Sequence, residues 1–199
     1  MESSTACILL SAGQSERLQF IPKAFLKFSK NENFIEHIIR IYSEAGIHII
    51  QVVINPKMEN ECAKSHQISG RYVVNNYPER GRLYSLQCGL RQLTDNRYCF
   101  VQNIDNPFVT PSLLENLVKN RSLADYITPV YNNKGGHPIL ITEKVIDYLL
   151  KLTNFNQTLR DVLQIFSRYN FPTDDPSVLI NINTQEDYNL YFGPNKSNG

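Results

Sequence analysis

The stretch that decides the fold lies near the N-terminus and reads Ala6-Cys7-Ile8-Leu9-Leu10-Ser11-Ala12-Gly13-Gln14-Ser15-Glu16-Arg17. A run of apolar residues followed at once by small ones is typical of a buried strand that ends in a turn. Small residues after a strand expose backbone N–H groups that bind phosphate oxygens, and Arg17 adds a fixed positive charge. We therefore expect a first strand over residues 6–10 and a candidate phosphate-binding loop directly after it.

The following part of the chain alternates similar apolar runs with segments of helical spacing. Further strands are expected over residues 51–54, 72–74, 98–101 and 126–130. One connecting segment places apolar residues at helical spacing at Phe34, Ile35, Ile38, Ile39 and Tyr42, and another at Leu83, Leu86, Leu90 and Leu93. This alternation predicts an α/β fold in which right-handed crossovers build a mostly parallel central sheet. Ligands bind such a sheet beyond the carboxyl ends of its strands, so a ligand site is expected in the loops that follow strands.

The second half is less regular and is expected to add an α+β appendage to the sheet. A strand is predicted over residues 138–141, helices over 143–152 and 159–166, and a last strand over 178–182. A closing helix is expected from Gln185, with Asn183 or Thr184 as its N-cap. Residues 193–199 are polar and are expected to form a loose tail.

The composition is that of one globular domain. The chain has 199 residues, of which 42% are hydrophobic and 20% charged, and 20 Lys and Arg against 19 Asp and Glu give a net charge of +1. We expect a single domain over residues 1–192, and no nucleic-acid or membrane partner, because the charge balance offers no bulk attraction to either. Neither the spacing of the cysteines nor the N-terminal residues suggest a disulfide framework or a signal sequence, so a reduced cytoplasmic setting fits.

The loop after the first strand belongs to neither common phosphate-binding motif. It lacks the Gly-Lys-Ser/Thr of a P-loop, and Gly13 alone does not make the glycine series of a dinucleotide fingerprint. Arg17 and Lys23 nevertheless flank small residues with two positive charges, as a transferring phosphoryl group requires. Taken alone, the loop is equally consistent with an ordinary turn that carries solvated charges.

Five motifs in order resemble the MobA-like nucleotidyltransferase family over nearly the whole chain. The opening motif of that family is matched at Leu10, Ala12, Gly13, Ser15, Arg17, Pro22, Lys23 and Leu26. Later motifs are matched by residues 76–90, which contain Asn76, Gly81 and Ser85, by Ile104-Asp105-Asn106-Pro107, by Gly136-His137-Pro138, and by residues 181–187. The resemblance implies a single-domain GT-A-like, Rossmann-related nucleotidyltransferase fold.

The resemblance also implies roles for the matched residues. Catalysis is assigned to Arg17, Lys23 and Asp105, and acceptor binding to Gly136 and His137. The nucleotide is expected to contact Leu10, Ser11, Ala12, Gly13, Ser15, Asn76, Gly81 and Ser85. In the implied reaction, an acceptor phosphate attacks the α-phosphorus of a nucleoside triphosphate in line, NMP is transferred and pyrophosphate leaves. Because that phosphate is already an anion near neutral pH, no general base is needed.

Asp105 and Asn183 are the expected ligands of a Mg²⁺ ion. Asp105 is expected just past the end of a strand, where a carboxylate can hold the ion against triphosphate oxygens. Alone, Asp105 is also explained as an Asx-turn residue before Asn106-Pro107, and His137 as a turn residue that packs locally. Asn183 replaces the Asp common in the family, so the protein supplies one formal negative charge to the metal.

Other departures from the family pattern bear on activity. Ser11 replaces Ala, Leu18-Gln19 replace Met-Gly, and Ile104 replaces the Gly before Asp105, where a side chain is expected to crowd the ribose or shift the backbone. Two alternatives therefore remain open beside a molybdopterin-type acceptor. One is a nucleotidyltransferase for a sugar phosphate or a phosphorylated alcohol, and the other is a nucleotide-binding regulator without turnover.

The base and the assembly state are further expectations. In the family, L-A-A-G tends to accompany pyrimidine use and L-A-G-G guanine use, so the methyl group of Ala12 favours CTP over GTP. Hydrogen bonds from Ser85 and the backbone near Gly81 would then read the cytosine edge. We expect a monomer or a weak homo-oligomer whose substrates are an NTP and a phosphorylated small molecule.

Overall fold

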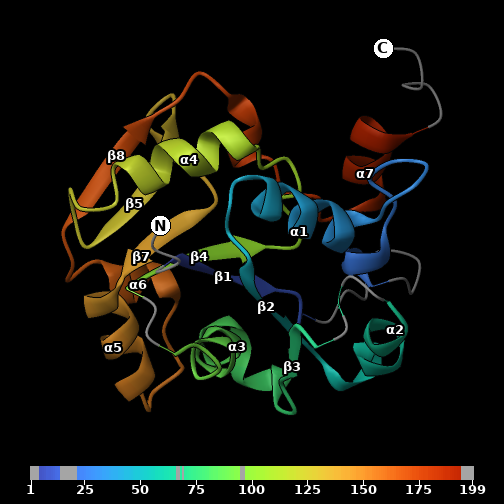
Figure 1. Ribbon diagram of the computed structural model, residues 1–199, viewed down its shortest axis with the longest axis horizontal. Helices are drawn as coiled ribbons and strands as arrows, with labels where there is room; N and C mark the ends of the chain where they lie inside the picture. The colour runs from blue at the N-terminus through green and yellow to red at the C-terminus, as the bar shows by residue number, and fades with distance from the viewer. Residues whose placement is uncertain (1–4, 14–21, 66–67, 69, 95–96, 194–199) are drawn as a thin grey trace.

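One mixed sheet runs through the molecule (Figure 1). The structure, a computed structural model, describes residues 5–13, 22–65, 68, 70–94 and 97–193. Its strands are β1 (Thr5–Leu10), β2 (Ile49–Ile54), β3 (Tyr72–Val74), β4 (Tyr98–Asn103), β5 (Tyr126–Tyr131), β6 (Lys134–Gly135), β7 (Ile139–Thr142) and β8 (Arg168–Pro172). The α-helices are α1 (Phe34–Glu44), α2 (Glu59–Lys64), α3 (Gly81–Leu90), α4 (Pro111–Lys119), α5 (Glu143–Lys151), α6 (Leu159–Leu163) and α7 (Gln185–Phe192). Short 3₁₀ helices are η1 (Lys23–Phe25), η2 (Pro56–Met58), η3 (Pro78–Arg80) and η4 (Pro176–Leu179).

The strand order is β3-β2-β1-β4-β7-β5-β6, and β8 pairs with β5. The pairs β1 with β2, β1 with β4, β2 with β3 and β5 with β8 are parallel, whereas β7 runs antiparallel to both β4 and β5. The predicted α/β class with a mostly parallel sheet is confirmed. Because β1, β2, β3 and β4 are parallel, their carboxyl ends share one edge, and the candidate site lies there.

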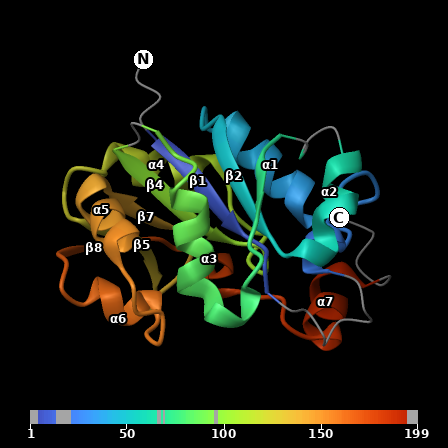
Figure 2. The ribbon, with the colours of Figure 1, turned by 90° about the horizontal axis from the view of Figure 1, so that it is seen from below.

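Helices cover both faces of the sheet, as Figures 1 and 2 show. In β1, Cys7 and Leu9 face a buried cluster that includes α1 and α4, while Ala6, Ile8 and Leu10 face a second cluster that includes α3, α5 and α6. Both sides of β1 are therefore apolar, which explains its continuous apolar run. In both views α5 and α6 lie at one end of the molecule, and α2 and α7 at the other.

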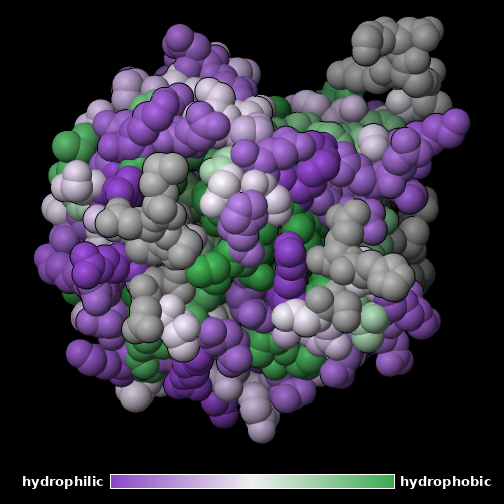
Figure 3. All heavy atoms as spheres, in the orientation of Figure 1, coloured by the Kyte–Doolittle hydropathy of each residue, from purple (hydrophilic) through white to green (hydrophobic). Residues whose placement is uncertain are grey.

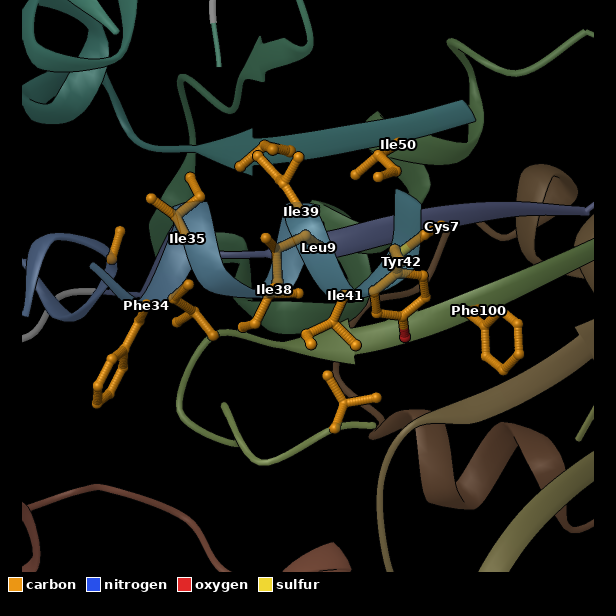
Figure 4. Close-up of a cluster of buried hydrophobic side chains, with 14 of the residues drawn as sticks. Cys7, Leu9, Phe34, Ile35, Ile38, Ile39, Ile41, Tyr42, Ile50 and Phe100 are labelled. Carbon is orange, nitrogen blue, oxygen red and sulfur yellow. The ribbon is translucent and has the colours of Figure 1, made fainter. Parts of the chain in front are cut away.

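Helix α1 begins and packs as the sequence predicts. Its N-cap Asn33 accepts a hydrogen bond from the backbone N–H of Glu36, and the Glu36 carboxylate accepts one from the backbone N–H of Asn33. The predicted apolar face is buried against the sheet, where Tyr42 lies edge-on to Phe100 (Figure 4). Full burial of one such side chain stabilises the fold by about 1.5–3 kcal/mol.

Helix α3 approaches the sheet so closely that one position admits only glycine. A Cβ atom at Gly89 would lie 2.7 Å from Cγ2 of Ile8 and 2.8 Å from Cγ2 of Val53. The glycine in this family motif therefore brings the helix, and with it the loop before the helix, against the edge where β1 ends.

The predicted last strand over residues 178–182 is wrong. Its first residues belong to η4 (Pro176–Leu179), and the rest is irregular. The side chain of Asp175 accepts a hydrogen bond from the backbone N–H of Ser177 at 2.8 Å and starts this turn. The carbonyl group of Ser177 is then bound by the side chain of Asn106 instead of by a strand. The apolar residues here are buried by a turn, which has no period that would distinguish it from a short strand.

Four elements, α2, α4, β6 and β8, were not expected, and α6 is shorter than expected. Strand β8 alternates exposed Arg168 and Asn170 with partly buried Tyr169 and Phe171, so it lacks the continuous apolar run used to identify strands. Helix α4 was also not predicted, although Thr110 caps it. Helix α6 ends at Leu163, earlier than predicted.

The face turned to the viewer in Figure 3 is mainly hydrophilic, and its hydrophobic residues lie mostly near the middle. Among the described residues, no helix has both the length and the apolar composition needed to cross a bilayer.

Candidate active site

A buried glutamine, Gln102, holds the turn that carries Asp105 by hydrogen bonds to its backbone. The amide group of Gln102 donates to the carbonyl oxygens of Asn103 at 2.9 Å and Asn106 at 2.8 Å, and its oxygen accepts from the Tyr42 hydroxyl at 3.0 Å. All of these contacts are in the interior, where hydrogen bonds between protein groups are not replaced by water. The backbone at Asp105 is thus fixed relative to β4 and α1.

A second set of contacts ties this turn to the segment before α7. The side chain of Asn106 donates to the Ile180 carbonyl oxygen at 2.5 Å, and the Ile182 N–H donates to the Asp105 carbonyl oxygen at 2.7 Å. Thr184 is the N-cap of α7, and the Asp187 carboxylate accepts hydrogen bonds from the backbone N–H groups of both Asn183 and Thr184 at 2.9 Å. Asn183 therefore lies beside Asp105, although 78 positions separate them in the chain.

Lys23 joins these two residues. Its ammonium group donates to Oδ1 of Asn183 at 2.7 Å and lies 3.8 Å from Oδ2 of Asp105. Lys23 is the first residue of η1. Asp105 comes from the middle of the chain and Asn183 from near its C-terminal end. Three of the residues that the sequence assigned to phosphate and metal chemistry are thus brought together.

The donor atoms fit a Mg²⁺ ion that is bound mainly through substrate. Oδ1 of Asp105 is buried and has no hydrogen-bond partner within the described part of the chain. A carboxylate oxygen beside an amide oxygen is the sparse set that Mg²⁺ takes when phosphates and water complete its shell. No group of three or more His, Cys, Asp or Glu side chains with metal-binding geometry occurs among the described residues. The Lys23 ammonium group contacts Oδ1 of Asn183 and lies near Oδ2 of Asp105, so it competes with a metal ion for these two oxygens and leaves Oδ1 of Asp105 to the metal.

The end of β1 brings buried small residues to this edge. The Ser11 N–H donates to the Val53 carbonyl oxygen at 2.8 Å, and the Leu10 carbonyl oxygen accepts from the Ile104 N–H at 3.2 Å. Leu10, Ser11 and Ala12 are buried, whereas Gly13 is exposed. The predicted nucleotide-binding Ser15 and the predicted catalytic Arg17 lie outside the described residues.

The side chain of Ile104 is buried in the cluster that contains α1 and α4, with 8% of its surface exposed. This position gives the isoleucine a packing role in the core.

Two of the three residues expected beside the base are held by hydrogen bonds within the protein. The side chain of Asn75 donates to the Ser85 hydroxyl at 2.9 Å, and that hydroxyl donates to the Gly81 carbonyl oxygen at 3.2 Å. Gly81 has a φ of +87°, which favours glycine at the start of α3. Asn76 is exposed. Asn75, which the sequence did not single out, is the fully buried residue that organises this loop, and its position directly after β3 was the available signal.

Gly136 and His137 are placed against η4. A Cβ atom at Gly136 would lie 2.4 Å from the Val178 carbonyl oxygen, and the His137 N–H donates to that same oxygen at 2.9 Å. Nε2 of His137 lies 3.0 Å from the side-chain nitrogen of Asn103 at the end of β4. The glycine therefore permits the contact that holds the histidine next to the Asp105 turn.

The imidazole of His137 is neutral near pH 7. Burial, and to a smaller extent the positive charge of Arg82, lower the pKa of His137 to about 4. Nδ1 of His137 and Oδ1 of Asn103 are buried without a hydrogen-bond partner among the described residues. A neutral ring with an unsatisfied nitrogen can orient a polar ligand group, and it has little affinity for a proton.

A cleft of about 1330 Å³ extends from His137 over the β5 and β8 part of the sheet. The start of α3 and residues 153–160 also line it. Among the described residues, its cationic side chains are Arg80, Arg82, Lys134, Arg160 and Arg168, and its one carboxylate is Glu79. No local sequence pattern predicts these cations as a group, because they are dispersed along the chain and only the fold brings them together.

Comparisons with known proteins show the family of the chain. The family model described as "MobA-like NTP transferase domain" matches residues 7–171. A "Probable molybdenum cofactor guanylyltransferase" of Clostridium perfringens (strain SM101 / Type A) is 28% identical over 126 residues, which are 63% of this chain and 59% of that relative. The match therefore spans less than two thirds of the length of the curated relative.

Solved structures share the fold. Rv0371c from Mycobacterium tuberculosis H37Rv superposes with a TM-score of 0.82 at 19% identity, covering 94% of this chain and 96% of that one. Its complex with manganese gives a TM-score of 0.78 at 17% identity, covering 94% and 97%. Molybdopterin-guanine dinucleotide biosynthesis protein A from Archaeoglobus fulgidus gives 0.70 at 20% identity, covering 94% and 96%. The family model covers most of the chain, and on that ground the chain belongs to the MobA-like NTP transferase family.

Proposed function

We propose that the protein transfers an NMP group from a nucleoside triphosphate to a phosphorylated small molecule, with Mg²⁺ bound and pyrophosphate released. The observation that carries this proposal is the convergence of Lys23, Asp105 and Asn183 at the carboxyl edge of the parallel strands, where one Asp105 oxygen has no partner in the part of the chain that the structure describes. A cation, a carboxylate and an amide at this edge suit a triphosphate better than they suit a neutral ligand.

The protein's own residues act by position and charge. Lys23 neutralises the charge that develops as the bond between the α- and β-phosphates breaks, and the sequence assigns the same task to Arg17. Asp105 and Asn183 would hold Mg²⁺, which supplies further charge neutralisation on the triphosphate oxygens. The acceptor arrives as an anion, so His137 orients it and removes no proton.

The donor nucleotide is the finer part of the proposal. The sequence predicts CTP because of the methyl group of Ala12, whereas the curated relatives are named guanylyltransferases. Ala12 is 4% exposed and belongs to the buried cluster of Leu83 and Leu86, so packing accounts for its methyl group. We therefore propose GTP as the donor, with CTP as the alternative.

The metal and the acceptor are proposed on similar support. The solved complex of Rv0371c with manganese supports a divalent ion in this fold. The names of the curated relatives support an acceptor of the molybdenum cofactor type. The cationic cleft equally suits a sugar phosphate, which is the second candidate for the acceptor.

The test is pyrophosphate release with each of the four NTPs, with and without Mg²⁺, across a panel of phosphorylated acceptors. Release that requires Mg²⁺, one preferred NTP and a phosphorylated acceptor is the expected result. NTP binding without release for every combination would instead support a nucleotide-binding regulator.

A further inference from the structure

One face of the sheet at β5 and β8 lines the cleft. In β5 the residues Tyr126, Thr128 and Val130 line it, and in the parallel neighbour β8 so do Arg168 and Asn170. The register pairs Tyr126 with Arg168 and Thr128 with Asn170, so these side chains stand on the same face. The alternate residues of both strands, such as Ile127 and Phe171, pack into the core on the other face. The charge of Arg168 is therefore directed into the cleft by strand alternation.

Arg168 crosses its neighbouring strand to reach the middle of that face. A Cβ atom at Gly135 would lie 2.6 Å from Nη2 of Arg168 and 3.1 Å from Cγ2 of Thr128. The guanidinium group thus lies against the backbone of Gly135, in space that any side chain at that position would take. Gly135 is two positions before His137, which contacts the end of β4 through Asn103.

The cations of the cleft form two groups. Arg82 lies close enough to Asp105 for their charges to interact, so it belongs with Lys23 to the end where the triphosphate is expected. Arg168 belongs to β8, and its side chain crosses β5 to reach Gly135 of β6, which pairs with the same edge of β5 as β7 does. The guanidinium group therefore lies at least one strand spacing, about 4.8 Å, to the side of β4. Lys134 and Arg160 line the same cleft.

The far group has little negative charge of the protein beside it. Within the described ranges, no carboxylate forms an ion pair with Arg168, Lys134 or Arg160, although the charge of Asp161 interacts with its neighbour Arg160. The single carboxylate that lines the cleft is Glu79, in η3. This concentration is local, because the whole chain has a net charge of +1. One acceptor phosphate at the α-phosphorus engages the near group and leaves the far group unused.

We propose that the acceptor carries a second anionic group, a phosphate or a carboxylate, which lies over β5 and β6 to the side of the phosphate that is attacked, and that Arg168 is the residue that selects it. Lys134 and Arg160 strengthen the field around this second group. The inference rests on the proposed function for the identity of the first phosphate. It narrows the acceptor to molecules with two anionic groups, each bound by a separate group of cations.

The test uses three linear probes of matched length: hexane-1,6-diol monophosphate, its bisphosphate, and 6-phosphooxyhexanoate. Binding is measured by calorimetry to the full chain with a non-hydrolysable NTP and Mg²⁺ present. We expect the bisphosphate and 6-phosphooxyhexanoate, which carry two anionic groups, to bind at least tenfold more tightly than the monophosphate, which carries one. The tighter of these two probes identifies the second group as phosphate or carboxylate. Equal affinity for all three probes would overturn the proposal.

Variants distinguish a specific contribution of Arg168 to binding from a nonspecific effect of the protein's positive charge. Arg168→Ala should abolish the preference for the two probes with a second anionic group and leave the affinity for the monophosphate unchanged. Gly135→Ala keeps the charge but displaces the guanidinium group, and should reduce the same preference. The matched control is Arg91→Ala, an exposed arginine after α3 and outside the cleft, which should change nothing. A preference that survives Arg168→Ala or Gly135→Ala, or that falls equally in Arg91→Ala, would overturn the assignment.

The outcomes also distinguish the two proposals. Binding is measured without turnover, so a selective Arg168-dependent preference would stand even if no acceptor released pyrophosphate, in which case the proposed function alone would fail. Pyrophosphate release with no such preference would leave the function standing and remove the second anionic group.

Discussion

The two halves of the sheet differ in how their polar side chains are paired. In the half proposed to bind the nucleotide, formed by β3, β2, β1 and β4 and called the donor half, Asn75 and Ser85 are hydrogen-bonded to each other and to the backbone, whereas Oδ1 of Asn103 and Oδ1 of Asp105, at the end of β4, have no partner among the described residues. In the half proposed to bind the acceptor, formed by β7, β5, β6 and β8 and called the acceptor half, the described residues give Arg168 no carboxylate partner in the cleft and Nδ1 of His137 no hydrogen-bond partner. Under the proposed function, the donor half has a fixed shape for one nucleotide away from the end of β4, whereas the acceptor half selects its ligand by charge.

Asp105 lies where the two halves meet, and its replacement should have the largest effect. Asp105→Asn leaves two amides and no formal protein charge for Mg²⁺, so transfer should be abolished at ordinary Mg²⁺ concentrations. Steady-state pyrophosphate release measures this. The matched variant Asn183→Asp adds a carboxylate and should keep activity, and loss of activity in both variants alike would show that charge on the metal is not what matters.

Lys23→Ala should have the next largest effect. Removal of the ammonium group should reduce turnover at saturating NTP by about 10²–10³-fold, which corresponds to a few kcal/mol of transition-state stabilisation. Lys27→Ala, an exposed lysine on the same segment, is the control and should retain wild-type turnover. The same loss is predicted for Arg17→Ala from the sequence. Near-wild-type turnover in Lys23→Ala would remove this residue from the mechanism.

His137 should make the acceptor half sensitive to acid. Its pKa is lowered to about 4 by burial and by Arg82, whereas an unfolded histidine titrates near about 6.5. The unfolded chain therefore takes up a proton first as the pH falls, so the stabilisation is complete above about pH 6.5 and is lost towards about pH 4, up to about 3 kcal/mol. Urea unfolding across this range should show a smaller acid loss in His137→Gln than in the wild type. An identical acid loss would mean that the ring is solvated.

Gly89→Ala should have the smallest effect and should act on the donor half alone. The added methyl group would approach Ile8 and Val53 within 2.8 Å, so we expect a destabilisation of about 1–3 kcal/mol. Gly13→Ala, where no atom of the described residues lies within 4 Å of the added Cβ, should leave the free energy of unfolding unchanged. If Gly89→Ala unfolded at the same urea concentration as the wild type, the helix would not be packed as closely as described.

The same contrast explains what the sequence could predict. The donor half was predictable because β1 and α1 carry unbroken apolar patterns and because its motifs are contiguous, as at Leu10 to Gly13. The meeting of Lys23, Asp105 and Asn183 followed from the order of the motifs.

The acceptor half was predicted less well, for physical reasons. β8 is buried on one face only, and a turn replaces the strand expected at residues 178–182, so neither has a decisive apolar run. The cations of the cleft come from α3, β6, α6 and β8, and no local pattern marks them. Asn75 was missed because its neighbour Asn76 has the same side chain, and only burial distinguishes the two.

The central claim is that the edge at Asp105 and Lys23 binds a triphosphate together with a divalent ion. Calorimetric titration of GTP and of CTP, with and without Mg²⁺, tests it without any acceptor. We predict weak Mg²⁺ binding to the protein alone, because Lys23 lies between the oxygens of Asp105 and Asn183, and NTP binding that Mg²⁺ strengthens in the wild type but not in Asp105→Asn. Tight Mg²⁺ binding without nucleotide, or equal strengthening in Asp105→Asn, would contradict the account.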